Sequence, residues 1–377
     1  MNANLFTTRL IKSNSHNAAR VLEITTPHGT LTTPTFMPVG TRAFVNHMTP
    51  HDLQDTHTQI ILGGNTYHML VSPGVEVIET NGGMHRLMAW QGPMLTDSGG
   101  YQVFSLSKNS KICKIDEQGA HFKHPLTGKI LHLTPQSSLQ AQRVIGADII
   151  MAFDECTPEQ GGRAAALAAM ARTHRWLLES KAAYEASPYS TYGKKQALFG
   201  IIQGGQVIVD AELDGIALGG EVIGFDIQQT VEVIDWVRPL LPENKPRYTM
   251  GVGLNPQDLV EVVRQGIDLF DCVAPTRNAR HGALYHGTLV RTDDWFTFVS
   301  EEKNGRILIK KSHYAKDDRP ILEGCVCYTC RHFTRAYLHF LFKQRSSFYS
   351  QLACIHNITV MQAVCDQMRA SILECSE

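Results

Sequence analysis

The chain reads YTMGVGLNPQDLVEVVRQGIDLFDCVA from Tyr248 to Ala274. Two short apolar runs, Tyr248 to Gly253 and Leu269 to Ala274, flank a helix-like segment from Pro256 to Gly266. Apolar runs that do not alternate with polar residues are typical of strands buried on both faces. The stretch therefore predicts a strand, a helix and a second strand parallel to the first.

Six more apolar runs of this kind precede Tyr248, and each ends in glycine or a polar residue. They are Phe36 to Gly40, Ile60 to Asn65, Met94 to Gly99, Ile149 to Asp154, Leu198 to Gly204 and Ile216 to Gly220. Helix-like segments lie between several runs, at Thr134 to Leu139 leading to Gly146, at Gly162 to Ala186 and at Val231 to Leu241. Eight runs with helices between them favour an α/β fold of the (β/α)8 TIM-barrel type, with an open doubly wound sheet as the alternative.

The pattern changes after Pro275, where a polar stretch leads to a cysteine cluster and two apolar-striped segments around 333–342 and 358–373. The spacing predicts that both segments are helices. We therefore expect a barrel with its catalytic rim over residues 1–275 and a metal-binding subdomain over residues 276–377.

Polar residues at the C-terminal ends of barrel strands lie on the face where TIM barrels carry out chemistry. Four residues of the chain are expected there: Asp97, Asp154, Gln203 and Asp271. For an aspartate at a strand end, a helix cap or a salt bridge is the alternative role.

Composition excludes several classes of protein. The chain has 377 residues, of which 43% are hydrophobic and 19% charged, without a bilayer-spanning run or a secretory signal, so we expect a cytoplasmic protein with no membrane contact. With a net charge of −1, contact with nucleic acid requires local basic patches. One candidate patch, which is equally explained as a solvated face, comprises Lys303, Arg306, Lys310, Lys311, Lys316 and Arg319.

Cys325, Cys327 and Cys330 place three sulfur ligands within six residues. Three thiolates and one imidazole form a closed tetrahedral Zn²⁺ site of the structural kind, so we expect one structural zinc per chain. Buried free cysteines or a redox pair are the alternatives. Four nearby histidines are candidates for the fourth ligand: His313, His332, His339 and His356. We prefer His356 because we expect it at the start of the last helix, where it would close the site.

Several segments, read in order, resemble the bacterial tRNA-guanine transglycosylase family. They are Met37-Pro-Val-Gly-Thr41, Leu62-Gly-Gly-Asn-Thr-Tyr-His68, Thr96-Asp-Ser-Gly-Gly-Tyr-Gln-Val103, Met151-Ala-Phe-Asp-Glu-Cys-Thr-Pro158, Met250-Gly-Val-Gly253, Phe270-Asp-Cys-Val273, Pro275-Thr-Arg277, the cysteine cluster and Arg335-Ala-Tyr337. The resemblance implies a barrel with a zinc-binding subdomain inserted near the C-terminus, and zinc ligands at Cys325, Cys327, Cys330 and His356. It also implies a homodimer that replaces the wobble guanine of tRNA with a free deazaguanine base, or exchanges it for free guanine.

Replacing a base at a ribose carbon is a glycosyl transfer, which needs one carboxylate as nucleophile and a second as acid and base. The resemblance assigns the nucleophile to Asp271 and the acid and base to Asp97. A barrel glycoside hydrolase with the same pair, or a non-catalytic RNA-binding subunit of the family, are the alternative functions.

The resemblance also assigns residues to base binding and to RNA binding. Asp154, Gln203 and the Gly220 N–H are expected to hydrogen-bond the base, while Tyr101 and Met250 stack on its two faces. From the apolar run alone, without the resemblance, Met250 is expected to be a core residue. Arg277 and Arg280 are expected to bind phosphates, together with the basic patch.

The sequence departs from the family at the loop that follows the sixth run. Bacterial members typically read Gly-Gly-Leu-Ala-Val-Gly-Glu, whereas this chain reads Gly219-Gly-Glu-Val-Ile-Gly-Phe225. The terminal carboxylate has become Phe225 and a new one stands at Glu221, next to Val222. Since the family's carboxylate favours an aminomethyl base, its loss favours queuine as the donor base. The chain is also shorter between Gln203 and Gly219, and it is longer between 286 and 305.

Overall fold

The computed structural model describes residues 5–107, 109, 111–125, 127–156, 162–202, 210–220 and 222–374. All eight predicted strands form. They are β4 (Thr35–Pro38), β5 (Ile61–Asn65), β6 (Met94–Asp97), β10 (Ile149–Met151), β11 (Ala197–Ile202), β12 (Gly215–Leu218), β13 (Arg247–Thr249) and β14 (Leu269–Cys272).

These strands form one parallel sheet in the order β4-β14-β13-β12-β11-β10-β6-β5. A parallel bridge between Val39 and Leu62 joins the two ends of that order, so the sheet closes on itself. The (β/α)8 barrel prediction is confirmed, and the open-sheet alternative is wrong.

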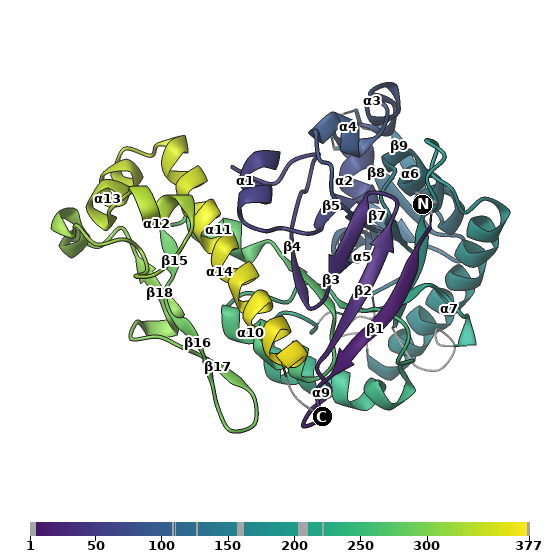
Figure 1. Ribbon diagram of the computed structural model, residues 1–377. Helices are drawn as coiled ribbons and strands as arrows, with labels where there is room; N and C mark the ends of the chain where they lie inside the picture. The colour runs from purple at the N-terminus through teal and green to yellow at the C-terminus, as the bar shows by residue number, and fades with distance from the viewer. Residues whose placement is uncertain are drawn as a thin grey trace.

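Helices surround the barrel (Figure 1). They are α1 (Pro50–Asp55), α2 (Thr66–Val71), α3 (Val75–Thr80), α4 (Met84–Met88), α5 (Gly100–Ser107), α6 (Pro135–Ile145), α7 (Gly162–Ala186), α9 (Ile227–Val237, followed by the 3₁₀ turn Arg238–Leu240) and α10 (Pro256–Arg264). Local sequence explains α6: Thr134 caps it, Pro135 follows at its first position, and Gly146 ends it with a φ of 82°. The predicted helix 231–241 begins four residues earlier, because the Asp226 side chain caps α9.

Two small antiparallel sheets accompany the barrel. One contains β1 (Thr7–Ser13), β2 (Arg20–Thr26) and β3 (Gly29–Thr32), and the other contains β7 (Cys113–Ile115), β8 (Ala120–Lys123) and β9 (Ile130–Leu133). Leu22, Ile24 and Leu31 of the first sheet pack into the same core as barrel residues such as Phe199 and Leu269. The first sheet therefore contributes directly to the barrel's core.

The C-terminal region extends away from the barrel, on the left in Figure 1. It contains α11 (Ala274–Arg280), the paired strands β15 (Ala283–Tyr285) and β18 (Arg306–Leu308), the hairpin β16 (Thr288–Arg291) and β17 (Phe296–Val299), 3₁₀ turns at Lys303–Gly305 and Ser312–Lys316, α12 (Tyr328–His332), α13 (Arg335–Lys343) and α14 (Ser347–Glu374). Helix α14 packs against β15 and α12 and also against β4 and α10. Helix α14 thus links this region to the barrel.

The longer segment between 286 and 305 forms the β16–β17 hairpin. Trp295 at its turn is 5% exposed, and its indole N–H donates to the Val260 carbonyl of α10 at 3.1 Å. The added residues therefore anchor the hairpin on a barrel helix. Among the described residues, no helix is long and apolar enough to cross a membrane.

Candidate active site and metal centre

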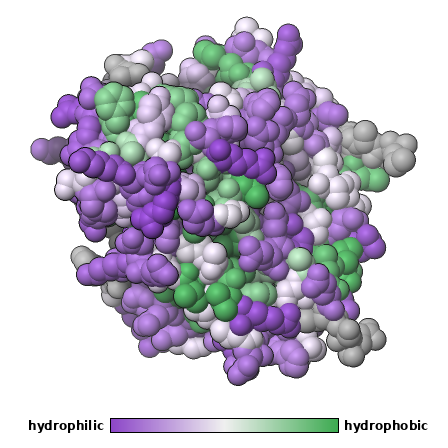
Figure 2. Space-filling view, turned by 60° about the vertical axis from the view of Figure 1, so that its left-hand side comes forward, coloured by the Kyte–Doolittle hydropathy of each residue, from purple (hydrophilic) through white to green (hydrophobic). Residues whose placement is uncertain are grey.

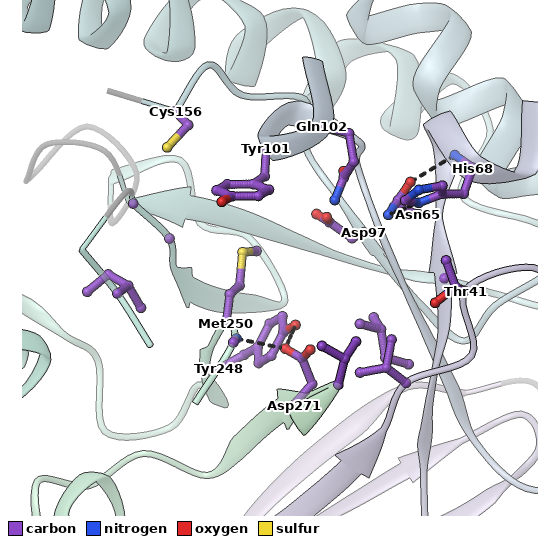
Figure 3. Close-up of a pocket in the computed structure, with 18 of the residues that line it drawn as sticks. Thr41, Asn65, His68, Asp97, Tyr101, Gln102, Cys156, Tyr248, Met250 and Asp271 are labelled. Carbon is purple, nitrogen blue, oxygen red and sulfur yellow. Dashed lines mark hydrogen bonds between the residues drawn. The ribbon is translucent and has the colours of Figure 1, made fainter. Parts of the chain in front are cut away.

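A cavity of about 250 Å³ opens at the C-terminal ends of the barrel strands (Figure 3). Seven of the residues singled out from the sequence line it: Asp97, Tyr101, Asp154, Gly220, Phe225, Met250 and Asp271. Val222 is not among the lining residues, although its neighbour Ile223 is. Gln203 and Glu221 lie outside the described residues. The barrel thus brings together residues that lie up to 174 positions apart, from Asp97 to Asp271.

Asp271 lies on β14 and is 7% exposed. One of its oxygens, Oδ1, accepts hydrogen bonds from the Tyr248 hydroxyl at 2.6 Å and from the Gly251 N–H at 3.1 Å. Burial raises the pKa of Asp271, and these two hydrogen bonds oppose that rise because they stabilise the anion. The pair of donors fixes the orientation of the carboxylate (Figure 3).

Asp97 ends β6 on the opposite side of the cavity from Asp271 (Figure 3). Burial and the nearby carboxylates of Asp154 and Asp271 raise the pKa of Asp97 to about 7. A carboxyl group with this pKa exchanges its proton readily at neutral pH. These two carboxyl groups of the site therefore lie in different environments, one held by two donors and one poised to carry a proton.

Asp154 follows β10 and is held by the loop after β6. The Ser98 hydroxyl donates to Asp154 Oδ1 at 3.0 Å. A Cβ atom on Gly100 would lie 2.2 Å from the same oxygen, so only glycine fits beside the carboxylate. The Ser-Gly-Gly stretch after Asp97 therefore helps to hold the Asp154 carboxylate in place.

Tyr101 and Met250 reach the cavity from different elements, α5 and the loop after β13 (Figure 3). The Tyr101 side chain is 39% exposed, whereas Met250 is partly buried and packs against the barrel core. Met250 thus belongs to the core and to the cavity wall at once. The gap between these two side chains suits a flat ring, because aromatic rings and thioethers both pack well against π surfaces.

The structure adds residues to which sequence reasoning gave no role. Asn65 caps α2: its Oδ1 accepts from the His68 N–H at 2.9 Å, and its Nδ2 lies 2.8 Å from His68 Nδ1. Both side chains line the cavity, as do Thr41, Gln102, Cys156 and Tyr248. Asn65 and His68 belong to a segment that carried the family resemblance. Tyr248 gave no such signal, since a tyrosine within an apolar run reads as core.

The predicted phosphate-binding arginines lie on α11, directly after β14. Arg277 is exposed and Arg280 is partly buried. The basic patch is less uniform than its sequence implies: Arg306 donates to Asn255, and Arg319 pairs with Asp317 at 2.8 Å. The other four cations of the patch are exposed.

The four predicted metal ligands meet in one cluster. His356 Nδ1 lies 3.8, 3.7 and 3.3 Å from the sulfur atoms of Cys325, Cys327 and Cys330. Tetrahedral zinc with Zn–S of about 2.3 Å and Zn–N of about 2.0 Å places sulfur and nitrogen about 3.5 Å apart. The His356 Nε2 lies 2.8 Å from the Tyr285 carbonyl, which orients the ring with Nδ1 toward the thiols. The donor set and spacing fit zinc.

The reason given for His356 was wrong, although the residue lies where it was expected. Helix α14 begins at Ser347, so His356 stands in its third turn and not at its start. Tyr349, Leu352 and Ala353 are buried ahead of it, so the helix already has a packed face there. The imidazole reaches the cluster from within the helix.

Comparisons with known proteins found matches over almost the whole chain. The family model described as queuine tRNA-ribosyltransferase matches residues 15–376. A queuine tRNA-ribosyltransferase from Synechococcus elongatus is 42% identical over 369 residues, which cover 95% of this chain and 89% of the relative. Proteins of the same name from Herpetosiphon aurantiacus and Halothermothrix orenii are 43% and 41% identical, over 96% and 97% of this chain and 88% and 93% of their own lengths.

Proposed function

Because the chain belongs to the queuine tRNA-ribosyltransferase family, whose members are pentosyltransferases acting on tRNA, we propose that it exchanges the wobble guanine of tRNA for a deazaguanine base. The observation that carries the proposal is one cavity with two differently tuned carboxyl groups, Asp97 and Asp271. Such a pair suits a double displacement at a ribose carbon.

In the first step, an oxygen of Asp271 bonds to C1′ of the ribose as the bond from C1′ to guanine breaks. Asp97 gives its proton to the departing guanine. In the second step, Asp97 takes the ring N–H proton of the incoming base, whose nitrogen bonds to C1′ and displaces Asp271. The pKa of Asp97, about 7, suits a group that both gives and takes a proton. The RNA strand stays intact because no phosphate bond changes.

Base recognition is proposed for the residues around this pair. Asp154 is a carboxylate that would face the N–H and NH₂ donors of guanine, and the Gly220 N–H together with Gln203 would face its carbonyl. The flat base would lie between Tyr101 and Met250, the two side chains that reach the cavity from α5 and the loop after β13.

We assign queuine, rather than the aminomethyl precursor base, as the preferred donor. Phe225 lines the cavity and is 74% exposed, at the position where bacterial members typically have a carboxylate. An apolar ring there offers no partner to a primary ammonium group. Exchanging the loop residues, with Glu221→Leu and Phe225→Glu, is expected to shift kcat/KM toward the aminomethyl base by about 10- to 200-fold. Equal or better use of the aminomethyl base by the wild type contradicts the assignment.

The Cys₃His cluster is proposed to hold one structural Zn²⁺, which has no open position for substrate and stabilises the C-terminal region when bound. Metal analysis of the purified protein tests this. About one zinc per chain is expected.

We further propose that the chain works as a homodimer. Four aromatic side chains of the C-terminal region are at least 39% exposed: Tyr328, Tyr337, Phe340 and Phe348. Figure 2 brings the left-hand side of Figure 1, where this region lies, forward and shows hydrophobic patches among hydrophilic residues. Exposed aromatic rings are enriched at protein interfaces. Phe340→Glu is expected to convert a dimer into a monomer in light scattering, whereas a monomeric wild type contradicts the proposal.

One experiment separates the proposed function from its alternatives. The protein is incubated with tRNA and labelled guanine, and the RNA is examined for label. Incorporation supports base exchange. Release of guanine without incorporation indicates a hydrolase, and RNA binding without either indicates a non-catalytic subunit.

A further inference from the structure

A second cavity, of about 530 Å³, lies where α11 meets the junction of α13 and α14. Its polar lining consists of three cations and two hydroxyl groups: Arg280, Lys343, Arg345, Ser346 and Ser350. We propose that this cavity binds a backbone phosphate of the tRNA, at a distance from the catalytic pair. The inference rests on the proposed function and extends it to Lys343 and Arg345.

The cavity carries positive charge that is not neutralised within the described part of the chain. No carboxylate lines it, and neither Arg280, Lys343 nor Arg345 forms an ion pair with a described residue. The nearby acid Asp52 is already engaged, because it accepts hydrogen bonds from the Thr49 cap and from Gln351. An anionic ligand is the group that such a cavity stabilises most.

Two features place donors at the cavity. Arg280 Nη1 is buried without a hydrogen-bond partner among the described residues, and an unsatisfied buried donor is costly. The cavity also lies at the N-terminus of the 28-residue helix α14, where Ser346 Oγ accepts from the Phe348 N–H at 3.2 Å. The helix dipole favours a phosphate at such an end.

Packing holds the walls of the cavity in place. The buried Tyr349 of α14 donates its hydroxyl to the Ala279 carbonyl of α11 at 3.0 Å, and its ring meets Phe342 edge-on at 5.0 Å. Arg345 occupies the turn between α13 and α14 with a φ of 53°. This left-handed conformation favours glycine or asparagine, so the backbone is strained at Arg345.

The position fits an RNA strand that enters the catalytic cavity. Helix α11 starts two residues after β14, which carries Asp271, and its seven residues rise about 10 Å to Arg280. The second cavity therefore lies a few nucleotides along the strand from a guanine bound between the two aspartates. An RNA strand bound at both cavities gains affinity from the phosphate contact, and this contact does not depend on the base sequence.

The test measures binding of an anticodon stem-loop RNA at several salt concentrations. The double variant Lys343→Ala with Arg345→Gly removes two cations, and glycine suits the left-handed turn, so the fold is expected to persist. The dissociation constant is expected to rise at least about tenfold in 0.1 M salt, and the slope of log K against log salt to flatten by about 2. The charge-retaining pair Lys343→Arg with Arg345→Lys is expected to keep most of the affinity.

The control removes Lys194 and Arg264, which precede β11 and end α10 at the opposite end of the barrel. Lys194→Ala with Arg264→Ala is expected to bind RNA as the wild type does. An unchanged slope and affinity in the Lys343→Ala, Arg345→Gly variant, with its melting temperature and zinc content retained, overturns the inference. Loss of inorganic phosphate binding alone, with RNA affinity intact, also overturns it, because the cavity would then serve a free anion. If the wild type incorporates guanine in that case, the proposed function stands without the second cavity.

Discussion

Tyr248→Phe removes a single atom from the site, the hydroxyl oxygen that donates to Asp271 at 2.6 Å. Burial and the adjacent carboxylates raise the pKa of Tyr248, so this hydroxyl keeps its proton and acts as a donor. A hydrogen bond to a charged group contributes about 1.5 to 3 kcal/mol. Its loss destabilises the Asp271 carboxylate by this amount, so the pKa of Asp271 is expected to rise further in Tyr248→Phe.

The sign of the effect on activity follows from the proposed roles. The nucleophile Asp271 must be ionised, so activity is lost as pH falls through its pKa. Asp97 must carry a proton in the first step, so activity is lost as pH rises through about 7. Tyr248→Phe moves the acidic limb upward toward the basic limb, and the pH profile is expected to narrow with a lower maximum.

The assay is kcat/KM for guanine exchange between about pH 5 and pH 9. A matched control is Tyr285→Phe, which removes the hydroxyl of another buried tyrosine, one that donates to the Leu254 carbonyl at 2.8 Å and not to a carboxylate. This control is expected to leave both limbs in place. An acidic limb in Tyr248→Phe that coincides with that of the wild type would refute the reasoning.

Four further substitutions test other parts of the structure. Asp271→Asn is expected to abolish exchange and the denaturation-resistant tRNA adduct, and Asp97→Asn to cripple turnover; an adduct in Asp271→Asn, detected by gel electrophoresis, would place the nucleophile elsewhere. Gly100→Ala is expected to displace Asp154 and to raise KM for guanine at least about tenfold, since overpacking costs about 1 to 3 kcal/mol; an unchanged KM contradicts the tight contact. Cys327→Ala is expected to lower the zinc content well below one per chain and to lower the melting temperature. A variant with full zinc content and a normal melting temperature would show that this cysteine is not a ligand.

Much of the fold was readable in the chain because the signals are local. Strands buried on both faces need continuous apolar runs, so all eight barrel strands were recognised. Helix ends such as Thr134 and Gly146 depend on caps within a few residues. The N-terminal three-stranded sheet was missed, since its pairing joins strands whose partly exposed residues carry a weaker pattern. The start of α14 was also missed, because an apolar stripe does not mark where a helix begins.

The sequence by itself determined the composition of the site: two strand-end aspartates, the glycines beside them, and a cysteine spacing that suits zinc. Only the tertiary structure decided how these groups act on one another. The pKa of Asp97 depends on burial and on two carboxylates, Asp154 after β10 and Asp271 on β14. The orientation of Asp271 depends on Tyr248 of a neighbouring strand, and the charge of the second cavity depends on the meeting of three helices. Each is an interaction across space between residues distant in the chain, and the strength of such an interaction is set by distance and burial, which the order of residues does not state.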